Sequence, residues 1–280
     1  MEKAIKRYFP IFVLPTMIAF TLGFIIPFAE GVYLSFCKFT TVNDAKFIGL
    51  SNYAKVFKDS TFVHAFWYTA AFTVVSVILI NVLAFAVALL LTKGIKGTNV
   101  FRTVFFMPNL IGGIVLGYIW QLLLNGILMK FSRTLTYSST FGFWGLVILM
   151  CWQQICYMMI IYIAGIQNIP GELIEAAEID GATKRQVLKS VTIPMVMPSI
   201  TVCTFLTLTN SFKLFDQNLA LTNGEPSKMS EMLALNIFNT FYGRAGYEGV
   251  GQAKAVIFFI LVAAIALTQN YLTRRKEVQQ

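Results

Sequence analysis

The sequence is poor in charge, histidine and cysteine, and each shortage argues against a class of protein. Only 12% of the 280 residues are charged, about half the usual share in soluble domains. One histidine and four cysteines leave little material for a disulfide scaffold or a multi-histidine metal site. Cys37, Cys151, Cys156 and Cys203 are scattered, and we interpret them as small apolar side chains. No metal site and no catalytic site is predicted.

Apolar residues are abundant instead, at 57% of the chain. This content would overfill a single globular core, and the chain can hold about six membrane spans of about 20 residues each. The sequence therefore predicts an all-α polytopic membrane protein that forms one membrane domain over residues 1–280. The predicted spans are 10–36, 66–91, 100–124, 141–166, 191–212 and 253–272. The fifth span carries many threonines and two prolines, which is typical of a helix that faces protein or a water-filled path.

The distribution of basic residues predicts the orientation, because cytoplasmic segments are enriched in Lys and Arg. With the N-terminus inside, segments 1–8, 92–102, 167–190 and 273–280 are cytoplasmic. They hold more than half of the 22 basic residues, including Lys93, Lys96 and the cluster Arg274-Arg275-Lys276. The net charge of +9 is thus interpreted as membrane anchoring charge, and no nucleic-acid partner is expected. Both termini are predicted to be cytoplasmic.

The last outside segment combines a turn with a helical pattern. The run LTNGEPS marks the turn through its Asn-Gly pair and its proline. Met229, Leu233, Ile237 and Phe241 then recur at every fourth position, which predicts an amphipathic helix. Such a helix either packs on the surface of the bundle or docks a partner.

The inside loop 167–190 carries the most information. It reads QNIPGELIEAAEIDGATKRQVLKS, with acidic residues first and basic residues last, as suits a helix macrodipole. Gly181 interrupts the pattern, so we expect two short helices joined there. By itself, the loop is either a solvated charged segment or a docking element.

With its flanks, this loop resembles the EAA motif of binding-protein-dependent ABC importer permeases. The pattern of that family is E-A-A, three residues, G, nine residues, then I-x-L-P. This sequence has the triplet at 175–177, Gly181, and Val-Thr-Ile-Pro at 191–194, with two apolar replacements in the last element. The runs FRTVFFMPNLIGGIVLGYIWQLLLN, SFKLFDQNLALTNGEP and IGLSNYAKVF resemble the carbohydrate branch, notably the compact six-span sugar permeases of Gram-positive bacteria.

The resemblance implies the type I ABC importer membrane-domain fold and a transport subunit in the bacterial cell membrane. It also implies three partners: a second permease in a heterodimer, an ABC ATPase dimer and an extracellular solute-binding protein. ATP and Mg would bind the partner ATPase, and this chain lacks the G-x-x-x-x-G-K-[ST] phosphate loop. The residues expected to contact the ATPase are Glu175, Ala176, Ala177 and Gly181.

Other classes of function fit the residues less well. An ion-coupled transporter usually carries ionisable residues deep in its spans, and here the span interiors are nearly free of charge. An intramembrane enzyme is disfavoured because the single histidine, His64, lies near the outer boundary. Within the importer class the resemblance favours sugars, and glycerol phosphate or a polyol is the alternative. A phosphorylated ligand would favour a basic residue such as Lys213, although Asp216 could simply pair with it.

Neutral polar side chains in the three central spans are the candidates for the substrate path. Amides and hydroxyls can hydrogen-bond sugar hydroxyls without placing a charge in the bilayer. The same groups could instead join helices to one another. Asn109 stands beside a Gly112-Gly113 pair that we expect to be flexible. The substrate-path candidates are Asn109, Trp152, Gln153, Gln154, Tyr157, Thr207, Asn210 and Ser211.

Overall fold

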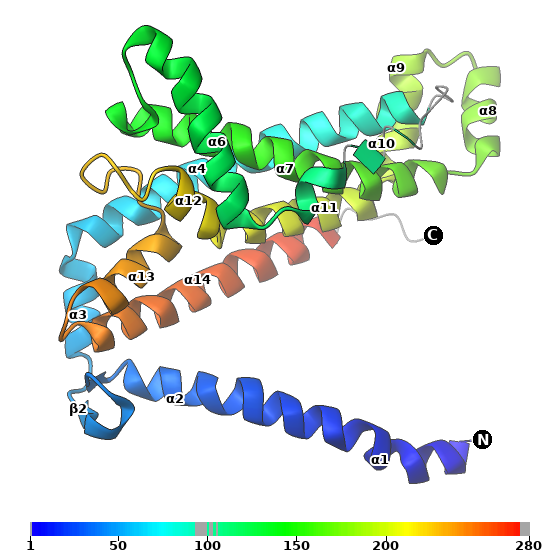
Figure 1. Cartoon of the computed structure of the whole chain (residues 1–280). Coiled ribbons are helices and arrows are strands. Elements are labelled where there is room, and N and C mark those ends of the chain that lie inside the picture. Colours follow the sequence, from blue (N-terminus) through cyan, green and yellow to red (C-terminus); the bar gives the residue numbers. More distant parts are fainter. Residues whose placement is uncertain (1, 93–99, 101–102, 105, 275–280) are drawn as a thin grey trace. The chain divides into compact units, whose positions relative to one another are not determined.

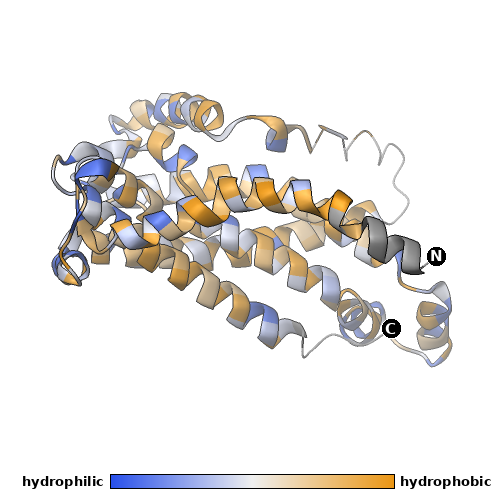
Figure 2. Ribbon diagram, turned by 90° about the horizontal axis from the view of Figure 1, so that it is seen from below, coloured by the Kyte–Doolittle hydropathy of each residue, from blue (hydrophilic) through white to orange (hydrophobic). Residues whose placement is uncertain are grey.

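The computed structural model describes residues 2–92, 100, 103, 104 and 106–274, and it omits the side chains of residues 2–8, 10 and 274. Five helices in these ranges are long and apolar enough to cross a membrane: Ile11–Leu34, Ser60–Leu91, Gly113–Phe131, Ser139–Gln167 and Glu248–Thr273. A sixth span is counted if the bent pair Lys184–Met195 and Met197–Phe212 acts as one. Figure 2 shows these helices as largely hydrophobic, with the hydrophilic residues concentrated at their ends and connections. Six predicted spans therefore correspond to these segments.

The chain divides into two compact units, Met1–Ser60 with Ile237–Ile260, and Thr61–Asn236 with Leu261–Gln280. Unit 1 begins with α1 (Glu2–Phe20), a π-helical turn (Thr21–Ile25) and α2 (Ile26–Leu34). A short hairpin follows, in which β1 (Cys37–Lys38) pairs antiparallel with β2 (Lys46–Phe47). The unit also holds α3 (Ser51–Lys58), most of α13 (Leu233–Gly243) and the first half of α14 (Glu248–Arg274) (Figure 1).

Asn52 joins the elements of unit 1, because its buried amide reaches two backbone carbonyls. Its Nδ2 donates to the carbonyl oxygens of Ser35 at 2.9 Å and Cys37 at 2.8 Å. Gly249 packs against the same place, and a Cβ there would lie 2.7 Å from Nδ2 of Asn52. A real Cβ does not approach another heavy atom so closely, so this position of α14 requires glycine.

Unit 2 is built around α4 (Ser60–Leu91), α7 (Ser139–Gln167) and α11 (Met197–Phe212). Its other elements are the 3₁₀ turns Met107–Leu110, Met129–Phe131 and Leu135–Tyr137, the helices α6 (Gly113–Leu128), α8 (Gly171–Ile179), α9 (Lys184–Val187), α10 (Ile193–Met195) and α12 (Asp216–Leu221), and the π-helical turn Leu188–Thr192. Leu146, Leu149, Met150 and Met158 of α7 are fully or almost fully buried in the core of this unit. The helices thus pack around an apolar core, and their outer faces are apolar as well.

A polar network crosses the core between the three central helices. Tyr162 of α7 donates its hydroxyl to Oδ1 of Asn81 on α4 at 2.7 Å. Asn81 donates its Nδ2 to Oγ1 of Thr207 on α11 at 3.4 Å. Hydrogen bonds of this kind join helices inside a membrane, where water cannot serve the same groups.

Two helix limits differ from the expected span boundaries. The third span was expected over 100–124. Residues 100, 103, 104 and 106 are helical, but Pro108 then lies in a 3₁₀ turn, and the continuous helix α6 begins at Gly113. The fifth span was expected to begin at 191, whereas helical structure begins at Lys184 and bends by 68° at the break before Met197. Two prolines on either side of the break, Pro194 and Pro198, explain it, because proline removes a backbone donor and clashes with the preceding turn.

The last outside segment agrees with its prediction in part. The amphipathic helix expected around Met229 forms only from Leu233 onward, as α13, and Met229 lies in the turn before it. The LTNGEPS turn is present, and Asn223 and Gly224 adopt positive φ there. Part of the charge that predicted the orientation, including Lys93 and Lys96 and residues 275–276, lies outside the described residues, so the orientation stays a prediction.

Candidate functional site

The loop between the fourth and fifth spans folds into α8 and α9, with Gly181 between them. The N–H of Gly181 donates to the carbonyl of Glu178, and the N–H of Ala182 donates to the carbonyl of Ala177, both at 3.0 Å. This pair of bonds is a Schellman motif, which ends a helix with one residue in the left-handed region. Gly181 has φ +79°, a conformation that costs a residue with a Cβ about 1–2 kcal/mol. Two short helices joined at Gly181 are therefore confirmed.

A capping box starts the second of these helices. Thr183 donates its N–H to Oε1 of Gln186 at 2.7 Å, and Gln186 returns its N–H to Oγ1 of Thr183 at 3.4 Å. The sequence carries this signal as T-x-x-Q, a pattern that was not among the predicted features of the loop. The turn between α8 and α9 is thus fixed from both sides.

The predicted coupling residues lie where a partner could reach them. Glu175, Ala176 and Gly181 are exposed, and Ala177 is half-buried. Ile179 is 86% exposed, which is costly for a large apolar side chain in water. The helix α8 thus exposes the apolar side chains of Ala176 and Ile179 beside the carboxylates of Glu172, Glu175 and Glu178.

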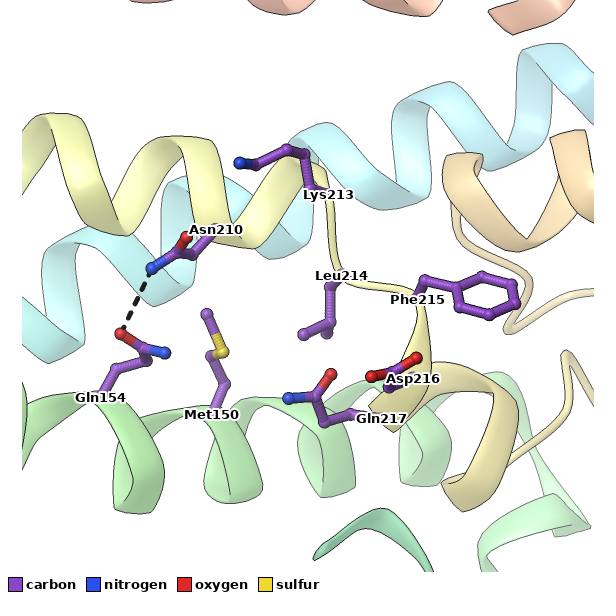
Figure 3. Close-up of a pocket in the computed structure, with 8 residues that line it drawn as sticks. All are labelled: Met150, Gln154, Asn210, Lys213, Leu214, Phe215, Asp216 and Gln217. Carbon is purple, nitrogen blue, oxygen red and sulfur yellow. Dashed lines mark hydrogen bonds between the residues drawn. The ribbon is translucent and has the colours of Figure 1, made fainter. Parts of the chain in front are cut away.

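A polar cavity of about 290 Å³ lies between α7, the end of α11 and the start of α12 (Figure 3). Gln154 and Asn210, both expected in the substrate path, face each other across it, and Nδ2 of Asn210 lies 3.5 Å from Oε1 of Gln154. The remaining lining residues are Met150, Lys213, Leu214, Phe215, Asp216 and Gln217.

Lys213 and Asp216 do not form the pair that was considered possible. In Figure 3 the side chain of Lys213 extends towards Asn210 and away from Asp216. Among the described residues no ion pair joins the two. The cavity is therefore lined by one cation and one carboxylate that do not pair with each other, and by the amides of Gln154, Asn210 and Gln217.

The other candidates are distributed over different environments. Gln153 is buried and accepts a hydrogen bond from Nε2 of Gln217 at 2.9 Å. Thr207 is fully buried and donates to the carbonyl of Cys203 at 2.7 Å, as part of the network between helices. Ser211 is fully buried, and its hydroxyl has no hydrogen-bond partner in the described part of the chain. Tyr157 is half-buried and packs against the core.

Trp152 and Asn109 lie apart from the polar cavity. Trp152 lines a separate apolar cavity of about 470 Å³ with residues of the Met107–Leu110 turn, including Pro108. Its ring packs edge-on against Trp120, with 5.5 Å between the centroids. Asn109 is half-buried in that turn and lines neither cavity.

Gly113 is a packing position and not part of a flexible pair. A Cβ at Gly113 would lie 2.7 Å from Cβ of Asp216, and a Cβ at Gly117 would lie 2.7 Å from Cβ of Ala220. These glycines stand four residues apart on α6 and allow α12 to pack closely against it. Gln217 was not predicted, because its position depends on the packing of α12 against α6, and the sequence offers there only the short polar triplet 216–218.

Taken together, the apolar helices, the exposed two-helix loop and the polar cavity define a polytopic membrane protein with a polar space inside its bundle. Residues 84–278 match the family described as "Binding-protein-dependent transport system inner membrane component". The chain is 43% identical over 278 residues to the "Probable starch degradation products transport system permease protein AmyD" of Thermoanaerobacterium thermosulfurigenes, covering 96% of this chain and 94% of that protein. The chain therefore belongs to this family of inner membrane transport components.

Two further comparisons agree with that assignment. The multiple sugar-binding transport system permease protein MsmF of Streptococcus mutans is 29% identical over 289 residues, covering 99% of both chains. A crystal structure of a bacterial ABC transporter that imports the acidic polysaccharide alginate superposes with a TM-score of 0.82. It is 21% identical and covers 98% of both chains, which establishes the type I ABC importer fold. The chain is thus a multi-pass membrane permease subunit.

Proposed function

We propose that this permease carries a sugar or oligosaccharide across the cell membrane as half of an ATP-driven importer. The observation that carries the substrate class is the polar cavity, in which Gln154, Asn210 and Gln217 place three neutral amides around a space of about 290 Å³. Each amide both donates and accepts hydrogen bonds, as a sugar hydroxyl does. The names of AmyD and MsmF, which refer to starch degradation products and sugars, support the same class.

The coupling part of the proposal rests on the α8–α9 segment. Exposed Ala176 and Ile179 offer a small apolar contact surface, and the Schellman turn at Gly181 holds it in one shape. A separate ABC ATPase, with ATP and Mg, would bind this segment and move it as a rigid body when the ATPase changes conformation. The chain would then contribute no catalytic group of its own, and both termini would lie on the cytoplasmic side with the ATPase.

The family description, which names dependence on a binding protein, supports the binding-protein part of the proposal. An extracellular solute-binding protein would deliver the sugar, and a second six-span permease would complete the path as a heterodimer. Co-expression of this chain with such a permease, the ATPase and the binding protein should give uptake. Full activity with this chain as the only permease would contradict the heterodimer.

A phosphorylated polyol is the second candidate, and Lys213 is the observation in its favour. This lysine lines the cavity without an ion pair to Asp216, so its ammonium could meet a phosphate. A ligand screen on the cognate binding protein separates the candidates. Binding of neutral oligosaccharides supports the sugar importer, binding of glycerol phosphate alone supports the alternative, and binding of only amino acids or peptides contradicts both.

A further inference from the structure

Another cavity, of about 680 Å³, lies between the end of α4 and the helices α8 and α9, which together form the proposed coupling segment Gly171–Val187. Its walls are mostly apolar and include Leu89, Ile174, Val187 and Leu188. The volume is within the range of about 300–1,000 Å³ that is usual for small-molecule sites. This space is separate from the polar cavity and does not share a lining residue with it.

The cavity and the exposed docking surface use opposite faces of α8. Ile174 and Glu178 line the cavity, and they are four positions apart, which places them on one face of a helix. Ala176 and Ile179 lie on the other side and are exposed. A molecule in the cavity would therefore leave the proposed ATPase contact surface free.

Two cations lie at the edge of this apolar space. Lys184 and Arg185 line the cavity, and both side chains are exposed. Glu178 lines it as well, yet within the described ranges no ion pair joins this carboxylate to either cation. An apolar cavity with two unpaired cations at its edge suits a molecule with an apolar tail and a negatively charged head.

The depth of the cavity in the bilayer supports the same class of ligand. The helix α4 has 32 residues and is thus about 48 Å long, which exceeds the hydrocarbon core of about 30 Å. Leu89 lies two residues before the end of α4 at Leu91, so this wall of the cavity falls near the headgroups. Basic pockets beside helices at this depth bind anionic lipid headgroups.

We propose that this cavity binds an anionic phospholipid, with its phosphate on Lys184 and Arg185 and part of an acyl chain against Leu89 and Val187. The lipid would brace the inner side of the coupling segment. The proposal depends on the membrane location of the chain and not on the identity of the transported solute.

Photolabelling tests this site directly. The full chain, with the subunits that co-purify with it, is placed in phosphatidylcholine nanodiscs that contain phosphatidylglycerol with a photoreactive acyl chain. Labelling of the peptides around Leu89 and Val187 is expected. Removing the charges in Lys184→Gln and Arg185→Gln should lower it about fivefold for each cation lost. The matched control is Lys189→Gln, because Lys189 is exposed and does not line the cavity.

A second pair of variants leaves the charges in place. Leu89→Trp should fill the cavity and abolish labelling there, whereas Leu90→Trp on the exposed neighbour should preserve it. Only variants that elute as a single species are compared. Equal labelling by a photoreactive phosphatidylcholine, unchanged labelling in both the charge and the cavity variants, or full competition by inorganic phosphate would each overturn the proposal.

Discussion

The ammonium of Lys254 lies 2.8 Å from Oδ2 of Asp59, and the lysine side chain is completely buried. Nζ of Lys254 also donates to Oγ1 of Thr240 at 2.8 Å. The ion pair joins α14 to the residue that precedes α4, and Thr240 adds a contact from α13. Unit 1 is thus held together by a buried charge as well as by apolar packing.

Removal of Asp59 should destabilise unit 1 more than removal of Lys254. Asp59→Ala leaves a buried ammonium without its carboxylate, and breaking such a pair from one side costs about 3–5 kcal/mol. Lys254→Met removes the charge itself and should cost less. Thermal unfolding of the purified chain measures both. Lys58→Met, an exposed lysine on α3, is the control, and a wild-type transition in Asp59→Ala would contradict the prediction.

The close approach of α7 and α11 predicts a rescue experiment at Gly165. A Cβ at this position would lie 3.0 Å from Cβ of Ser199, with the Ser199 hydroxyl even closer. Gly165→Ala should therefore overpack the contact and cost about 1–3 kcal/mol. The double variant Gly165→Ala with Ser199→Gly should regain most of the lost stability, as measured by thermal unfolding. Additive effects of the two substitutions would refute a direct contact.

The conformation of Gly181 predicts an ordered series of coupling defects. Gly181→Leu must place a Cβ at φ +79° and should abolish substrate-stimulated ATP hydrolysis in the assembled importer. Gly181→Asn should retain part of it, because asparagine tolerates the left-handed region better than leucine does. Gly126→Leu, at an open position of α6, is the control. Normal import by the leucine variant would remove Gly181 from the coupling role.

The polar cavity predicts losses of uptake at Gln154 and Asn210. Replacing either with leucine removes hydrogen bonds worth about 0.5–1.5 kcal/mol each, so uptake at low substrate concentration should fall about two- to tenfold. Basal ATP hydrolysis and assembly should be retained. Thr209→Val is the matched control, because Thr209 donates to its own helix backbone and does not line the cavity. Unchanged uptake in both leucine variants would leave these residues as links between helices.

The network between the central helices predicts a small effect at Tyr162. Tyr162→Phe removes the hydrogen bond to Oδ1 of Asn81, whereas Nδ2 of Asn81 keeps its hydrogen bonds to the carbonyl of Val77 and to Thr207. Hydrogen bonds between membrane helices average about 0.6 kcal/mol, so the midpoint of thermal unfolding should fall only slightly. A loss of transport without a loss of stability would instead assign the network to the transport cycle.

The helices and the coupling loop were predictable because their signals are local. Long apolar runs locate the spans, and the spacing from Glu175 to Gly181 locates the helix end. The start of the third span was not predictable from hydropathy, because Pro108 interrupts an apolar run that continues through it. The cavity was predicted only in part. Gln154 and Asn210 lie on long helices, whereas Gln217 reaches the cavity through the packing of α12 on α6, which no local pattern encodes.

The bend beside Val196 lets the helical segment Lys184–Met195 rotate about one end relative to Met197–Phe212. The arm Lys184–Met195 has 12 residues and is thus about 18 Å long. If the 68° bend opened or closed by about 10°, the far end at Lys184 would move by about 3 Å, the length of one hydrogen bond. Small rotations at the proline-flanked break are therefore large enough to exchange contacts at α8. Conversely, a partner that binds α8 and moves it would rotate the fifth span about this bend without unfolding any helix.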